Sequence, residues 1–152
     1  MPMKTLIRKQ SGFTLLEILV AMLILAIGLL GLAGLMTSSM RDNLSASHRT
    51  QATWMAYDMI DRMRANRVGA IAGSYATAMA AAAACSPAVP TGTVPAQDIA
   101  AWKSQLACVL PAGTGSIAVD TGTREATIVI RWDDSRGTQG TATQTFRVET
   151  QL

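Results

Sequence analysis

The chain opens with a long apolar run that contains a single charge. Between Phe13 and Met36 the only charged side chain is Glu17. The uncharged part, residues 18–36, would form a helix of about 28 Å at ~1.5 Å per residue, enough to cross a hydrocarbon core of ~30 Å. The pattern therefore predicts a membrane-spanning segment over residues 13–36.

Helical spacing continues beyond the apolar run. No proline occurs between Met36 and Pro87, so nothing of that kind ends the helix at the membrane. Arginines before Gly69 are typical of a helix C-terminus. We expect one helix from about Phe13 to about Arg67. Its amphipathic half, residues 37–68, carries an apolar face with helical periodicity, formed by Ala52, Met55, Ala56, Met59, Ile60 and Met63.

The residues after the helix are expected to fold into a layer that covers this apolar face. Alternating apolar and polar residues predict short strands, at residues 117–119, 125–133 and 145–149. Asp, Gly and Ser predict turns between them, at residues 120–123 and 133–140. Before the strands we expect an Ala-rich helix or loop at 76–84, a Pro-rich loop at 86–95 and a short helix at 97–107. The expected fold class is α+β, a long N-terminal helix packed against a small antiparallel sheet in a head at residues 69–152.

Composition supports an element that is kept away from water. Hydrophobic residues make up 49% of the chain and charged residues 15%. A small soluble domain needs more polar surface than this, and a disordered chain needs more charge. The composition therefore argues against an ordinary soluble monomer and against a disordered chain.

The net charge of +3 comes from one end of the chain. Lys4, Arg8 and Lys9 precede the apolar run, and no acid accompanies them. By the positive-inside rule they place the N-terminus in the cytoplasm and the head on the other side. We therefore expect no nucleic-acid partner from the charge excess. A cleaved secretory signal is the alternative, although its apolar region is usually about 7–15 residues long.

Cys85 and Cys108 are the only cysteines. If the head lies outside the cytoplasm, a disulfide between them is favoured. It would close a loop of about 24 residues and contribute about 3 kcal/mol. Two buried free thiols are the alternative.

Glu17 needs an explanation, because a lone carboxylate in a membrane span costs about 3 kcal/mol. No Lys, Arg or His occurs between Lys9 and Arg41. Cutting the bond between Gly12 and Phe13 would create an α-amino group four residues before Glu17. A carboxylate that simply lies among lipid headgroups is the alternative.

These residues together resemble a known signal. A basic leader, Gly12, Phe13-Thr14-Leu15-Leu16-Glu17 and a long apolar helix resemble the class III signal of type IV pilins and type II secretion pseudopilins. The resemblance implies that a prepilin peptidase removes residues 1–12 and methylates the amine of Phe13. It also implies that Glu17 neutralises the N-terminal amine of a neighbouring subunit during assembly. A pair between Phe13 and Glu17 of one chain is the alternative.

Two further segments are similar to minor pilins of the PilV family, a family whose variable head also bears a disulfide. They are AIGLLGLAGL at residues 26–35 and DRMRANR at residues 61–67. The resemblance implies a non-enzymatic minor pilin that primes type IV pilus assembly and lies at the tip, supporting twitching motility and adhesion. It would be a single-pass inner-membrane protein with a periplasmic head before it enters the fibre on the cell surface. A minor pseudopilin of a type II secretion system is the alternative.

The partners implied are other pilins and the assembly apparatus. They are the other minor pilins, the major pilin, prepilin peptidase, the pilus assembly platform, a tip adhesin and inner-membrane lipid. We expect no cofactor and no metal.

Other motifs favour structural roles. Asp120-Thr121-Gly122 matches the triplet of aspartic proteases, but such an enzyme needs two carboxylates that share a proton. A β-turn is therefore the better interpretation. The single His48 excludes a catalytic triad and a multi-histidine metal site. Asp133-Asp134-Ser135 fits a polar hairpin loop better than a Ca²⁺ site. The arginines at residues 62–67 are diluted by Asp58 and Asp61 and do not indicate DNA binding.

Overall fold

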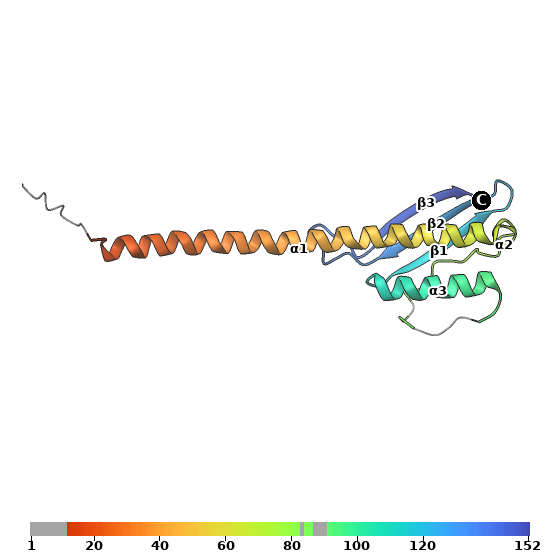
Figure 1. Cartoon of the computed structure of the whole chain (residues 1–152), viewed down its shortest axis with the longest axis horizontal. Coiled ribbons are helices and arrows are strands. Elements are labelled where there is room, and N and C mark those ends of the chain that lie inside the picture. The colour runs from red at the N-terminus through yellow and green to blue at the C-terminus, as the bar shows by residue number, and fades with distance from the viewer. Residues whose placement is uncertain (1–11, 83, 87–90) are drawn as a thin grey trace, which may run out of the picture. The chain divides into compact units, whose positions relative to one another are not determined.

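The computed structural model describes residues 12–82, 84–86 and 91–152. The chain forms two compact units, Met1–Ser39 and Met40–Leu152, and helix α1 (Leu15–Ala65) runs through both. The other elements all belong to the second unit (Figure 1). They are α2 (Arg67–Ile71), α3 (Val94–Val109), β1 (Thr114–Asp120), β2 (Glu125–Trp132) and β3 (Gln144–Gln151). The predicted α+β class, with a long apolar helix and a small C-terminal antiparallel sheet, is confirmed.

The first unit consists of the apolar part of α1. All of its described residues from Gly12 to Thr37 are exposed, and Leu15 and Leu30 are 77% and 74% exposed. By length and composition this part of the helix is able to cross a membrane. An apolar surface of this extent requires lipid or a protein partner around it.

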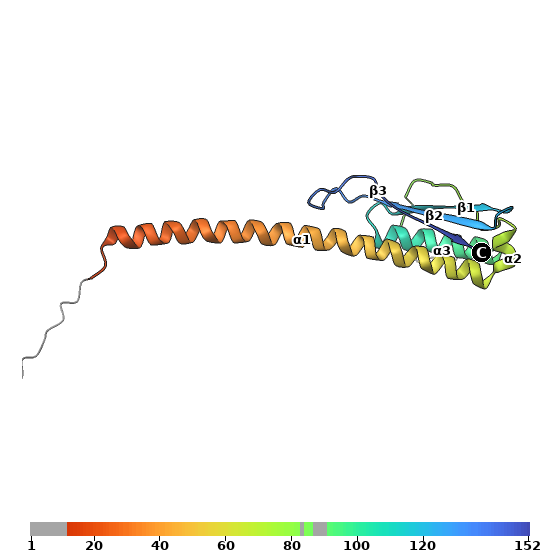
Figure 2. The same ribbon diagram turned by 90° about the horizontal axis from the view of Figure 1, so that it is seen from above.

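The second unit has two layers. Its sheet is antiparallel with strand order β1-β2-β3, and Ile128 pairs with Ile117 on one side and with Val148 on the other. The second half of α1 and α3 lie on one face of this sheet (Figure 2). Every second residue of β2, from Ala126 to Trp132, is buried, so a shift of the register by one residue would move these side chains to the other face.

The core of the second unit lies between these layers. Met59 and Met63 of α1 are fully buried, which confirms the predicted inner face of the amphipathic half. From the sheet, β2 contributes every second residue to the same core, namely Ala126, Ile128, Ile130 and Trp132. Phe146 and Val148 of β3 are half-buried against this core.

Helix α3 packs closely on β1 because residue 115 is glycine. A Cβ atom at Gly115 would lie 2.3 Å from the ring of Trp102. The indole Nε1–H of Trp102 in turn donates a hydrogen bond of 3.0 Å to the carbonyl of Met55. This single buried ring therefore joins α3 to β1 and to α1.

Several element boundaries differ from those predicted. Strand β1, for example, spans Thr114–Asp120 and is longer than the predicted residues 117–119. Helix α3 begins at Val94, so the expectation of a loop through Pro95 is wrong at its end. Pro95 is tolerated because the first turn of a helix needs no backbone N–H from it. Helix α1 ends at Ala65, because Asn66 leaves helical geometry before the short α2 begins.

Candidate functional site

The start of α1 is a capped helix N-terminus. Thr14 precedes the first helical residue, and its Oγ1 accepts a hydrogen bond of 3.3 Å from the backbone N–H of Glu17. Thr followed three residues later by Glu is the capping-box pattern, and an acid in the first turn is favoured by the helix dipole. Glu17 thus occupies a defined position in the helix cap. The T-x-x-E spacing of Thr14 and Glu17 is the signal in the sequence for this cap.

The predicted cleavage residues lie just before this cap. Gly12 is exposed, and a Cβ atom at that position would meet nothing within 4 Å. Phe13 is 79% exposed. Phe13 and Glu17 line the same shallow surface together with Ile18 and Ala21. The structure therefore brings Phe13 and Glu17 to one side of the helix N-terminus, and the bond between Gly12 and Phe13 lies outside the helix.

A comparison with family models bears on this N-terminal arrangement. Residues 7–33 match the prokaryotic N-terminal methylation motif. This motif indicates a type IV pilin or pseudopilin. The matched residues include Gly12, Phe13 and Glu17, and such a leader implies processing by prepilin peptidase and assembly with other pilins. No curated protein and no solved structure matches the chain.

The head of this pilin-like chain contains a disulfide. Cys85 and Cys108 are bonded, with their Cα atoms 4.7 Å apart. Beside them, the Ser104 hydroxyl donates a hydrogen bond of 2.6 Å to the carbonyl of Ser86. The segment that precedes α3 is therefore fastened to the end of α3 by one covalent and one polar link.

A polar network joins α1 to α3 at the far end of the second unit. The Tyr75 hydroxyl donates to Asp98 at 2.7 Å, and Arg62 contacts both Asp98 at 3.3 Å and Asp58 at 2.9 Å. Burial, and then the hydrogen bond to Asp98, raise the pKa of Tyr75. Burial acts to lower the pKa of Arg62, but hydrogen bonds and charge attraction from Asp58 and Asp98 outweigh it and raise that pKa. The network therefore fixes these side chains in one arrangement.

The two turn carboxylates are occupied by backbone groups. Asp120 accepts hydrogen bonds from the N–H groups of Gly122 at 2.8 Å and Thr123 at 3.1 Å, as expected for the predicted β-turn. These bonds, that from Thr123 first, lower the pKa of Asp120. Asp133 accepts one from Ser135, which lowers its pKa too. Within the described ranges no three His, Cys, Asp or Glu side chains gather to hold a metal ion.

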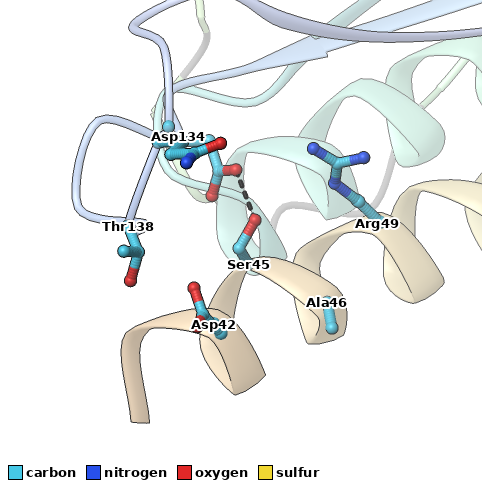
Figure 3. Close-up of a pocket in the computed structure, with 8 residues that line it drawn as sticks. Asp42, Ser45, Ala46, Arg49, Asp134 and Thr138 are labelled. Carbon is cyan, nitrogen blue, oxygen red and sulfur yellow. Dashed lines mark hydrogen bonds between the residues drawn. The ribbon is translucent and has the colours of Figure 1, made fainter. Parts of the chain in front are cut away.

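Asp134 lies in the predicted loop after β2, but its side chain is buried. It is only 3% exposed, and it accepts a hydrogen bond of 2.5 Å from the hydroxyl of Ser45 on α1 (Figure 3). Next to this contact is a hollow of about 440 Å³, lined on α1 by Asp42, Ser45, Ala46 and Arg49. The partner lies 89 residues away in sequence, so no local pattern pointed to it.

Proposed function

We propose that this chain is a non-enzymatic minor pilin of the type IV pilus. It would be part of the minor-pilin complex that primes pilus assembly and lies at the tip, supporting twitching motility and adhesion. The observation that carries the proposal is the methylation motif at residues 7–33, followed by the long apolar helix. The similarity of residues 26–35 and 61–67 to PilV-type minor pilins supports the finer assignment.

In this proposal prepilin peptidase cleaves after Gly12 and methylates the new amine of Phe13. The exposure of both residues supports access by a peptidase. The carboxylate of Glu17 then pairs with the N-terminal amine of a neighbouring subunit. Two charges that are each costly in hydrocarbon become tolerable as a pair, so that pairing sets the axial register of the subunits.

The proposed topology is a single pass through the inner membrane. Lys4, Arg8 and Lys9 favour a cytoplasmic N-terminus, which leaves the head in the periplasm. The disulfide between Cys85 and Cys108 supports an oxidising compartment for the head.

The surface proposed for assembly is the exposed side of α1. The apolar part would pack among the helices of other pilins in the fibre. On the second unit Trp54 is 69% exposed and Tyr57 is 52% exposed, and exposed aromatic side chains of this kind often anchor protein interfaces. The partners would be the other minor pilins, the major pilin, the assembly platform and a tip adhesin.

The second candidate is a minor pseudopilin of a type II secretion system, because pilins and pseudopilins share the methylation motif. Fractionation of cells separates the two. The chain should appear in sheared surface pili, and its deletion should abolish twitching while leaving protein secretion intact. Loss of secretion with normal pili would replace the minor-pilin proposal by the pseudopilin one.

A further inference from the structure

The loop after β2, residues 133–141, is fastened to α1 by a buried carboxylate. One oxygen of Asp134 accepts the hydrogen bond from Ser45, and the other lies 3.7 Å from Nδ1 of His48. The side chains of His48 and Asp134 are 12% and 3% exposed. Ser45 and His48 are three residues apart and therefore lie on the same side of α1.

When His48 is neutral, the contact with α1 does not fully offset the cost of burying the Asp134 carboxylate. A buried carboxylate is costly unless hydrogen bonds and an opposite charge offset the loss of water. Ser45 supplies one hydrogen bond. Nδ1 of His48 is buried and has no hydrogen-bond partner in the part of the chain that the structure describes. A proton on His48 would place a positive charge next to Asp134.

The backbone of the loop at residues 133–141 is tightly folded, so the loop cannot easily form another contact with α1. Its backbone is closed by a hydrogen bond of 2.9 Å from the N–H of Asp134 to the carbonyl of Thr141. A Cβ atom at Gly140 would lie 1.6 Å from the carbonyl oxygen of Asp134, and one at Gly137 would lie 3.3 Å from Cβ of Ser45. Gly140 therefore allows the loop to close tightly on itself, and Gly137 allows it to lie directly against α1.

Other charged side chains belong to the elements around His48 and Asp134. On α1, Asp42 and Arg49 line the adjacent hollow and carry opposite charges. The loop itself carries Asp133, whose carboxylate is held by Ser135, and Arg136. On β2, Arg131 alternates with the core residue Trp132 and so lies on the other face of the sheet.

We propose that His48 and Asp134 form a pH-dependent latch between α1 and the loop at residues 133–141. The protonated imidazole holds the loop on the helix, and loss of that proton loosens it. Histidine is the side chain that normally changes charge between pH 5 and 8. Since protonation favours the docked form, docking is strongest at the acidic end of this range and weakens as pH rises. This latch does not depend on the proposed pilus role.

Hydrogen exchange of the full-length chain in detergent micelles tests the latch. After correction for intrinsic exchange rates, amides of residues 133–141 should be about 5-fold better protected at pH 5.5 than at pH 7.5. Amides of β2 serve as an internal reference and should show no such change. Equal protection at the two pH values, or better protection at pH 7.5, would overturn the proposal.

Variants separate the latch from general loop stability. His48 is the only histidine in the chain, so His48→Gln removes the titrating group and should abolish the pH dependence of the loop. Ser45→Ala should lower protection at both pH values and keep the pH dependence. Asp42→Asn, in the same hollow, should behave as the native chain. A pH dependence that survives in His48→Gln contradicts the latch.

Discussion

The hydroxyl of Tyr75 lies 2.7 Å from one carboxylate oxygen of Asp98, and the other oxygen lies 3.3 Å from Nη1 of Arg62. Asp98 belongs to α3, Arg62 to α1 and Tyr75 to the segment after α2. A single carboxylate therefore joins three parts of the second unit that are separate in sequence. It complements the buried ring of Trp102, which joins the same two helices through its hydrogen bond to the carbonyl of Met55.

Replacing this carboxylate should destabilise the head. In Asp98→Ala the Tyr75 hydroxyl and part of the Arg62 guanidinium lose their acceptor, which should lower the free energy of unfolding by about 2 kcal/mol. Asp61→Ala is the control, because its pair with Arg64 is exposed and should change stability by about 0.5 kcal/mol or less. Urea titration of the full chain, followed by tryptophan fluorescence, measures both. Equal losses would show that Asp98 has no special role.

The raised pKa of Tyr75 predicts a loss of stability in alkali. The folded head keeps the Tyr75 proton at a pH at which the unfolded chain, with an ordinary pKa of about 10, has lost it. The contribution is therefore complete below that pH and is lost as pH rises toward the raised value. Tyr75→Phe should make the unfolding curves at pH 9 and 11 more alike. Tyr57→Phe, at an exposed position, should leave their difference unchanged.

The two sides of α1 should respond differently to truncation. Met59→Ala opens a space in the core and should lower the free energy of unfolding by about 2–5 kcal/mol. Trp54→Ala should change it by about 0.5 kcal/mol or less, since the ring is exposed. If the exposed side is an assembly surface, Trp54→Ala should still lower the amount of protein in purified pili. Normal incorporation would remove Trp54 from that surface.

Much of the fold was predictable because its signals are local. The apolar run, the helical spacing of Met55, Met59 and Met63, and the alternation along β2 each depend on a few neighbouring residues. The position of Asp134 was not predictable in this way. Its burial depends on contacts with Ser45 and His48, whereas the sequence around it is typical of a polar hairpin loop.

The sequence predicted which residues belong to the N-terminal site, but it did not predict the contact between Thr14 and Glu17. The spacing of Gly12, Phe13 and Glu17 was sufficient to expect a processing signal, and the methylation motif now covers those residues. The cap formed by Thr14 was not predicted, because a lone carboxylate in an apolar run points to a charged partner, whereas the cap uses the backbone N–H of Glu17. Glu17 therefore has a local role in the helix as well as the proposed role in assembly.

These two roles of Glu17 are separable by substitution. Glu17→Ala should leave cleavage of the leader intact and impair incorporation into pili, because the neighbouring amine loses its counter-charge. Thr14→Ala removes the side-chain cap and keeps the carboxylate, so it is the matched control. Immunoblots of membranes and sheared pili measure processing and incorporation. Similar defects in both variants would indicate that Glu17 acts only through the helix cap.

Processing and assembly as a pilin require a new N-terminus at Phe13. Mass spectrometry of the N-terminal peptide of the mature protein, isolated from its native membrane, identifies that terminus. We predict a chain that begins at Phe13 and carries a methyl group on its α-amine. A mature chain that begins at Met1, or one that begins after Ala33, would contradict it.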